Sequence, residues 1–131
     1  GFPEEIDAST KNTLIWLAWK RDNFEYFDFF MTEFKDVLET QRYQSEYWQN
    51  RLGQYYLKYK SYDNAIEFFN KGRKEFEETA RIYNGLGHAY LGKQNRKLAI
   101  EYLKVAVDIA IKNSDDKLER YQSDLDNAVK G

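Results

Sequence analysis

The side chains of this sequence that could carry out chemistry are few, and the first is a histidine. His88 is the only histidine in the chain, and an imidazole can serve as a general base or a metal ligand. On a helix, its neighbours three and four residues away are asparagine, glycine and leucine, and none of these ionises. We therefore interpret His88 as a hydrogen-bonded or solvent-facing side chain.

Carboxylates and serines give no stronger signal. Acids stand next to each other at Glu4 and Glu5, at Glu77 and Glu78, and at Asp115 and Asp116. Adjacent residues do not share a face of a helix, and the last pair stands where negative charge favours a helix N-terminus. None of the serines lies in the G-x-S-x-G pattern of a nucleophile elbow. We predict no catalytic residue and no enzymatic activity.

Two glycines in "NGLGHAY" could suggest a phosphate-binding loop. The dinucleotide fingerprint G-x-G-x-x-G needs a third glycine between a strand and a helix, but Tyr90 stands at that position and the flanks are helical in pattern. We therefore interpret Gly85 and Gly87 as helix-packing residues. The sequence has no cysteine, which removes disulfides and cysteine-built zinc sites, and we predict neither a metal nor a cofactor.

The composition favours one helical domain. A length of 131 residues lies within the about 100–200 residues of a single domain. No apolar run approaches the about 18 residues that a membrane-spanning helix needs. The 20 basic and 22 acidic residues are mixed along the chain, so we expect no nucleic-acid partner. One proline, seven glycines and an aromatic share of 18% favour an all-α fold.

The compartment stays open between cytoplasm and periplasm. The start, "GFPEEID", lacks the basic and apolar regions of a signal peptide. Because the sequence begins with Gly rather than Met, we expect the native N-terminus to lie upstream.

An internal repeat is the strongest pattern in the chain. "LGQYYLKYKSYDNAIEFF" begins at Leu52 and "LGHAYLGKQNRKLAIEYL" begins at Leu86, an offset of 34 residues. This offset also aligns Gly53 with Gly87, Tyr56 with Tyr90, Ala65 with Ala99, Phe69 with Leu103 and Gly72 with Ala106. Each copy has the apolar spacing of a helix, a break at "KSYD" or "QNR", and a second helix. We expect the small residues to let the two helices of a pair approach closely.

This helix pair resembles the tetratricopeptide repeat family, whose pattern is W-x2-L-G-x2-Y followed by A-x3-F. The resemblance covers roughly residues 46–112 and implies a right-handed superhelix of antiparallel α-helix pairs. The sequence departs from the pattern at two positions. The tryptophan position holds Gln49 and Tyr83, and the closing proline position holds Glu77 and Ile111.

The flanks complete a single domain over residues 1–131, with repeats at 46–79 and 80–113. Upstream, "LIWLAWKRDNFEYFDFFMTEF" aligns with the first copy at an offset of 38, which predicts a degenerate first helix pair at 8–45 with a longer exit loop. In it, Phe27 stands where Ala65 is small, and we expect this ring either to push the pair apart or to require different packing. Downstream, residues 114–131 read as a capping helix with Ser114 or Asp115 as its N-cap. The total is seven helices.

The resemblance also implies a function, because first helices of the family line a groove that binds peptides or protein segments. The groove positions of the family fall on Tyr47, Asn50, Gln54, Lys58, Arg81, Asn84, His88 and Leu91. Asparagine at the same site of both repeats can hold a peptide backbone by donating and accepting at once. Lys58 and Arg81 would favour an acidic or C-terminal carboxylate group. The subgroup that binds heat-shock chaperone tails needs a Lys at Asn50 and an Asn at Gln54, so we do not expect that partner.

Three alternatives stay open. The repeat block and its tail look similar to C-terminal extensions of some bacterial α/β-hydrolase esterases, which would make the chain an accessory domain of a larger protein. Self-association into a homo-oligomer is a second alternative, because aromatic residues are concentrated near the middle of the chain at Tyr43, Tyr47, Trp48, Tyr55 and Tyr59. Trp16 and Trp19 with Lys20 and Arg21 occur on membrane-surface helices, although the same rings are needed in a helical core.

Overall fold

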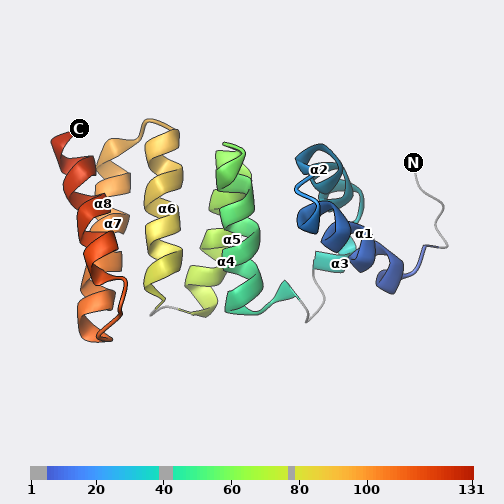
Figure 1. Ribbon diagram of the computed structural model, residues 1–131, viewed down its shortest axis with the longest axis horizontal. Coiled ribbons are helices and arrows are strands. Elements are labelled where there is room, and N and C mark those ends of the chain that lie inside the picture. The colour runs from blue at the N-terminus through green and yellow to red at the C-terminus, as the bar shows by residue number, and fades with distance from the viewer. Residues whose placement is uncertain (1–5, 39–42, 77–78) are drawn as a thin grey trace. The chain divides into compact units, whose positions relative to one another are not determined.

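The computed structural model describes residues 6–38, 43–76 and 79–131, and these residues form eight helices and no strand (Figure 1). The helices are α1 (Ala8–Lys20), α2 (Phe24–Glu33), α3 (Lys35–Leu38), α4 (Glu46–Lys58), α5 (Tyr62–Glu75), α6 (Ala80–Gly92), α7 (Arg96–Lys112) and α8 (Leu118–Lys130). The predicted all-α repeat fold is confirmed. Four of the paired acids, Glu4, Glu5, Glu77 and Glu78, lie outside the described residues.

The chain divides into two compact units, Gly1–Ser45 and Glu46–Gly131. In the first unit, α1 and α2 pack on each other and α3 packs on both. Asp7 and Asn23 begin the two longer helices, because their side-chain oxygens accept hydrogen bonds from the backbone N–H groups of Thr10 (2.7 Å) and Tyr26 (3.1 Å). The unit therefore has helix boundaries that its own sequence specifies.

The core of the first unit accommodates a large ring at the position where the repeat has alanine. The Phe27 side chain is fully buried, together with those of Ile15, Met31 and Phe34. The predicted exit loop contains the one-turn helix α3, which was not among the seven expected helices. This turn buries Val37 and Leu38, so the apolar residues after α2 are part of the core.

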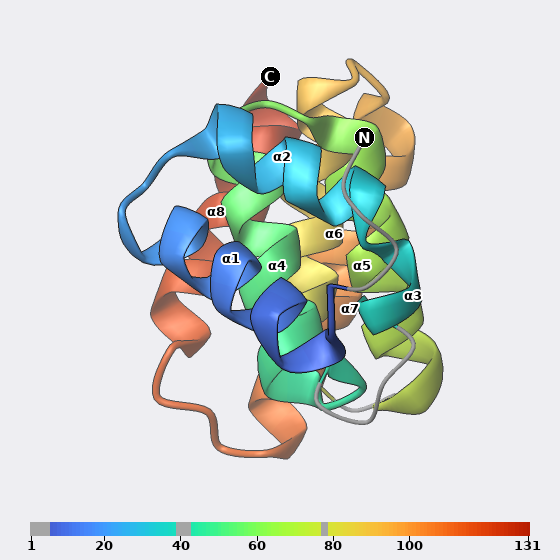
Figure 2. The ribbon, with the colours of Figure 1, turned by 90° about the vertical axis from the view of Figure 1, so that its right-hand side faces the viewer.

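In the second unit, each helix packs on the next one along the chain, and α4 also packs on α6. Figure 2 shows α5 and α7 on one side of this unit and α8 on the other. The first helices of the two copies, α4 and α6, are thus direct neighbours. The accessible side chains of α4 and the half-buried ones of α6 therefore lie on adjacent helices.

The turns between paired helices repeat one hydrogen-bond pattern. The backbone N–H of Ser61 donates to the carbonyl of Tyr56, and that of Asn95 donates to the carbonyl of Tyr90, both at 2.9 Å. The residue before each donor is in the left-handed region, with φ of 61° at Lys60 and 64° at Gln94. The turn between α1 and α2 has the same geometry, with φ of 56° at Asp22 and a 2.9 Å bond from Asn23 to Ala18. The offsets of 34 and 38 residues therefore align equivalent turns.

Glycines permit the predicted close approach of paired helices. A Cβ atom added at Gly53 would lie 2.5 Å from Cε1 of Phe69, and one added at Gly87 would lie 2.5 Å from Cδ2 of Leu103. Phe69 and Leu103 are equivalent residues of the two copies, and both are fully buried. The packing role that the sequence predicted for Gly53 and Gly87 is confirmed.

The last helix covers the apolar end of the second copy. Tyr121 of α8 is buried against Ala80, Val107 and Ala110, and three further apolar residues pack on this cluster, namely Ile109, Leu118 and Leu125. The predicted N-cap was wrong, because α8 begins at Leu118 and its N-cap residue makes no side-chain capping bond. The Asp115 carboxylate instead accepts the N–H of Lys117 at 2.8 Å and orders the turn before the helix.

Candidate functional site

The predicted groove residues of α4 lie at helical spacing along its length. Tyr47 and Gln54 are exposed and Asn50 is half-buried, so these side chains share the accessible part of the helix. The amide of Gln54 lies 3.5 Å from the Asn50 side-chain oxygen. The Lys58 ammonium lies 5.4 Å from the centre of the Tyr59 ring, an exposed cation–π contact. This helix therefore presents mainly amide groups, flanked by an aromatic ring and a cation.

On α6, Arg81 is already engaged by a carboxylate of the chain. Its guanidinium forms a two-pronged ion pair with Glu46 at the start of α4. The hydrogen bonds to Glu46 raise the pKa of Arg81 above its ordinary value. The guanidinium that the sequence assigned to a partner's carboxylate thus joins the first helices of the two copies.

Asn84 and His88 contact the same residue of α8. The Asn84 amide donates to Oδ2 of Asp124 at 3.0 Å, and Nε2 of His88 lies 3.0 Å from that same oxygen. Asn84 is 4% exposed, whereas its repeat equivalent Asn50 is half-buried. The two asparagines therefore have different environments, because α8 packs beside α6 and contributes Asp124.

Sequence reasoning missed Asp124. The residue lies on the helix that was interpreted only as a cap, and the groove positions were taken from the first helices of the two copies. Asp124 lies three residues after Tyr121 and directly before Leu125, which places it at the edge of the apolar face of α8. That position is only a weak sign of a functional role.

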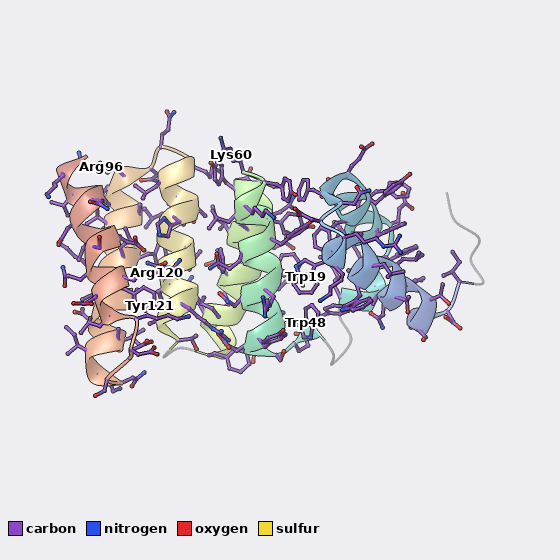
Figure 3. All side chains as sticks on the ribbon, in the orientation of Figure 1. Trp19, Trp48, Lys60, Arg96, Arg120 and Tyr121 are labelled. Atoms are coloured by element: carbon purple, nitrogen blue, oxygen red, sulfur yellow. The ribbon has the colours of Figure 1, made fainter. Side chains whose placement is uncertain are left out.

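Leu91, the last predicted residue, lines an open cavity between α6 and α8 of about 420 Å³. Its lining residues come from α6, from the turn and first residue of α7, and from α8 with the residue after it: His88, Leu91, Gln94, Arg96, Asp124, Asn127, Ala128 and Gly131. Figure 3 labels Arg96 beside the last turn of α8. Its Nε atom donates to the carbonyl of Ala128 at 2.7 Å, and Nη2 donates to the carbonyl of Val129.

Two other cavities have a different character. An apolar one of about 270 Å³ lies in the first unit between α1 and α2, next to Ala18 and Phe30. A polar one of about 300 Å³ adjoins the Arg81–Glu46 pair and Tyr121, and burial raises the pKa of the Tyr121 phenol. In the described parts of the chain, no three His, Asp or Glu side chains are placed to hold a metal ion.

Two further features are the exposure of the central aromatic residues and the length of the helices. Tyr43 and Tyr55 are buried, so the central aromatic residues expose only part of the surface that the sequence suggested, at Tyr47 and Tyr59. Within residues 6–38, 43–76 and 79–131, no helix has the length and apolar character needed to cross a bilayer.

Both copies of the repeat match a known protein family. Residues 49–72 and 80–111 match the family model described as tetratricopeptide repeat. The first segment covers most of α4 and α5, and the second covers α6 and nearly all of α7. No curated protein matches the chain.

Proposed function

The chain contains tetratricopeptide-like repeats, as its sequence predicted, and we propose that it binds an extended segment of a partner protein along the face of α4 and α6. Tetratricopeptide repeats are generally protein–protein interaction modules, and the family is typically non-enzymatic. The proposal concerns the location of the contact and the residues that make it.

The accessible amides of α4 are the observation that carries the proposal. Asn50 and Gln54 lie one turn apart and present donors and acceptors to solvent. An extended peptide offers one N–H and one C=O per residue, so amide side chains can bind it without reading its sequence. Tyr47, whose ring lies 5.0 Å from the Arg51 guanidinium, adds an exposed aromatic surface at the same face.

The structure supports a smaller set of contact residues than the eight predicted ones. Arg81 is paired with Glu46, and Asn84 is buried against Asp124, so both stabilise the fold in this account. We therefore assign partner contacts to Tyr47, Asn50, Gln54, Lys58 and Leu91. We also assign one to His88, because its ring lines the open cavity beside α8 although Nε2 lies 3.0 Å from Asp124. The neighbouring face of α8 extends this surface beyond the two copies.

Peptide display tests the proposal directly. Random twelve-residue peptides would be selected on the wild-type chain, and the enriched peptides would be measured against Asn50→Ala/Gln54→Ala. We expect binding to weaken several-fold without a change in melting temperature, because these side chains are accessible. The matched control is Glu67→Ala/Glu101→Ala, which truncates two exposed residues of α5 and α7. Equal binding by wild type and the α4 variant would contradict the proposed face.

Exposed rings of the first unit favour self-association as a second candidate function. Trp16, Tyr26 and Phe29 are 40%, 58% and 44% exposed, and large exposed apolar side chains are common at protein interfaces. Light scattering over a range of concentrations would detect a dimer, and Tyr26→Glu/Phe29→Glu would dissociate it. A monomer at every concentration would exclude this candidate.

A further inference from the structure

The open cavity between α6 and α8 combines an apolar wall with polar side chains. Its volume of about 420 Å³ lies within the range of about 300–1,000 Å³ that is usual for ligand sites. Leu91 and Ala128 provide the apolar wall, and His88, Gln94 and Asn127 provide groups that can donate or accept hydrogen bonds. An occupant therefore needs an aliphatic part and a polar part.

The two charged residues that line the cavity differ in how far the chain satisfies them. Asp124 accepts a bond from Asn84 and lies within hydrogen-bond distance of His88, so its carboxylate is already engaged. Within the described residues, Arg96 donates to two backbone carbonyls, which carry no net charge. Among the residues that the structure describes, no carboxylate forms an ion pair with Arg96.

The guanidinium of Arg96 has capacity for a further partner. It carries five N–H donors, and the two bonds to α8 use one at Nε and one at Nη2. The neighbouring Lys97 is also exposed and adds positive charge to the same turn. Lys93 of the same turn forms an ion pair with Asp63, so that carboxylate is also engaged. The local charge therefore complements an acidic group rather than a basic one.

We propose that this cavity is a specificity subsite that takes an aliphatic side chain of the bound segment, with an adjacent acidic residue of that segment paired to Arg96. The inference rests on the proposed function, because the cavity continues the surface of Leu91 and His88 on α6. In this proposal, the amides of α4 bind the backbone of the segment whatever its sequence, and the cavity selects which side chains the segment carries.

The test separates the two halves of the subsite. Asn127→Phe fills the cavity from an exposed position of α8, and its control, Ser123→Phe, places the same ring on α8 at a residue that does not line the cavity. Arg96→Gln removes the charge, Arg96→Lys retains it, and Lys97→Gln removes a charge from the same turn without altering the cavity lining. The probe is the set of twelve-residue peptides selected on the wild-type chain, each also synthesised with its aliphatic or its acidic residue replaced by alanine.

We expect Asn127→Phe and Arg96→Gln each to remove one of the two binding preferences. The wild type selects peptides with an aliphatic residue next to Glu or Asp, and replacing either one weakens binding about tenfold. Asn127→Phe no longer distinguishes the aliphatic residue from alanine, and Arg96→Gln no longer distinguishes the acidic residue from alanine. Arg96→Lys, Lys97→Gln and Ser123→Phe keep both preferences. A merely structural role of Arg96 would weaken all peptides equally, and that result would overturn the proposal.

Two further outcomes distinguish this inference from the proposed function. Peptides that bind through Asn50 and Gln54 but ignore every cavity variant would overturn the subsite and leave the binding face in place. A selection that enriches no peptide would overturn both.

Discussion

Phe69 lies between glycines of two different helices. A Cβ atom added at Gly53 of α4 would lie 2.5 Å from the ring at Cε1, and one added at Gly85 of α6 would lie 2.5 Å from it at Cζ. The ring is fully buried, so it has no free space to move into. A single side chain thus sets the separation between its own helix and the first helices of both copies.

We expect Gly53→Ala to lower the free energy of unfolding by up to about 2 kcal/mol. Overpacking a core costs about 1–3 kcal/mol, and the gain of about 1 kcal/mol from replacing glycine by alanine inside a helix offsets part of this cost. Urea denaturation measures the change, and Gln54→Ala on the same helix serves as the exposed control. The Phe69→Leu background should reduce the effect of Gly53→Ala, because the clashing atoms are removed. Stabilisation by Gly53→Ala would contradict this expectation and show that the Phe69 ring can move to accommodate the added methyl group.

The link between Asn84 and Asp124 should contribute to stability. A hydrogen bond to a charged group contributes about 1.5–3 kcal/mol, and solvent at the half-buried Asp124 reduces this value. We expect a double-mutant cycle of Asn84→Ala and Asp124→Ala to give a coupling of about 1 kcal/mol. Asn50→Ala should leave stability unchanged. Additive effects of the two changes would mean that the bond contributes nothing.

Local interactions determine where the helices begin and end. The N-cap of α1 is an example whose effect depends on pH, because the Asp7 side chain ionises. The backbone and side-chain hydrogen bonds from Thr10 lower the pKa of Asp7 below its ordinary value of 3.8. A lowered pKa in the folded state means that the ionised cap stabilises α1 above the ordinary value and is lost as the pH falls through the lowered one. The start of α1 should therefore fray in acid.

Nuclear magnetic resonance can follow this transition at the amide of Thr10 and at the carboxyl group of Asp7. Asp7→Asn retains an acceptor at the cap without titrating, so its Thr10 amide should not respond over the same pH range. An Asp7 carboxyl that titrates at or above 3.8 would contradict the bond.

The last turn of α8 depends on Arg96 at the start of α7. Arg96→Ala removes the donors to the carbonyls of Ala128 and Val129, and we expect it to lower stability by about 1 kcal/mol and to speed amide exchange near Lys130. Lys97→Ala removes the same charge from the neighbouring position and should have little effect. Equal losses in both variants would assign the effect to charge rather than to the two bonds.

The sequence predicted the helices and turns better than it predicted which side chains contact one another in the fold. The repeat offsets place the turns at Lys60 and Gln94 because helix breaks and small residues are local signals. The helix α3 was missed because one turn of helix carries too little periodicity to be recognised. At the candidate site, Asn50 and Asn84 looked equivalent, and their difference depends on a contact with Asp124 about 40 residues away, which no periodic pattern encodes.

At the scale of the whole molecule, the chain consists of two compact units, each with its own buried core. In repeat proteins each helix pair contacts only its neighbours, so stability is approximately a sum of local contributions. The second unit includes both matched copies and the helix that covers the cluster around Val107 and Tyr121. The second unit therefore includes a capping helix at its C-terminal end.

We expect residues 46–131 to fold without the first unit. The fragment should have a helical circular dichroism spectrum and a cooperative thermal transition, because α4 to α8 pack on one another in chain order. Residues 46–112, which lack α8, provide the comparison. Removing Tyr121 uncovers Ala80, Val107 and Ala110, so this shorter fragment should melt at a lower temperature and aggregate more readily. An unfolded 46–131 fragment would show that the second unit depends on the first.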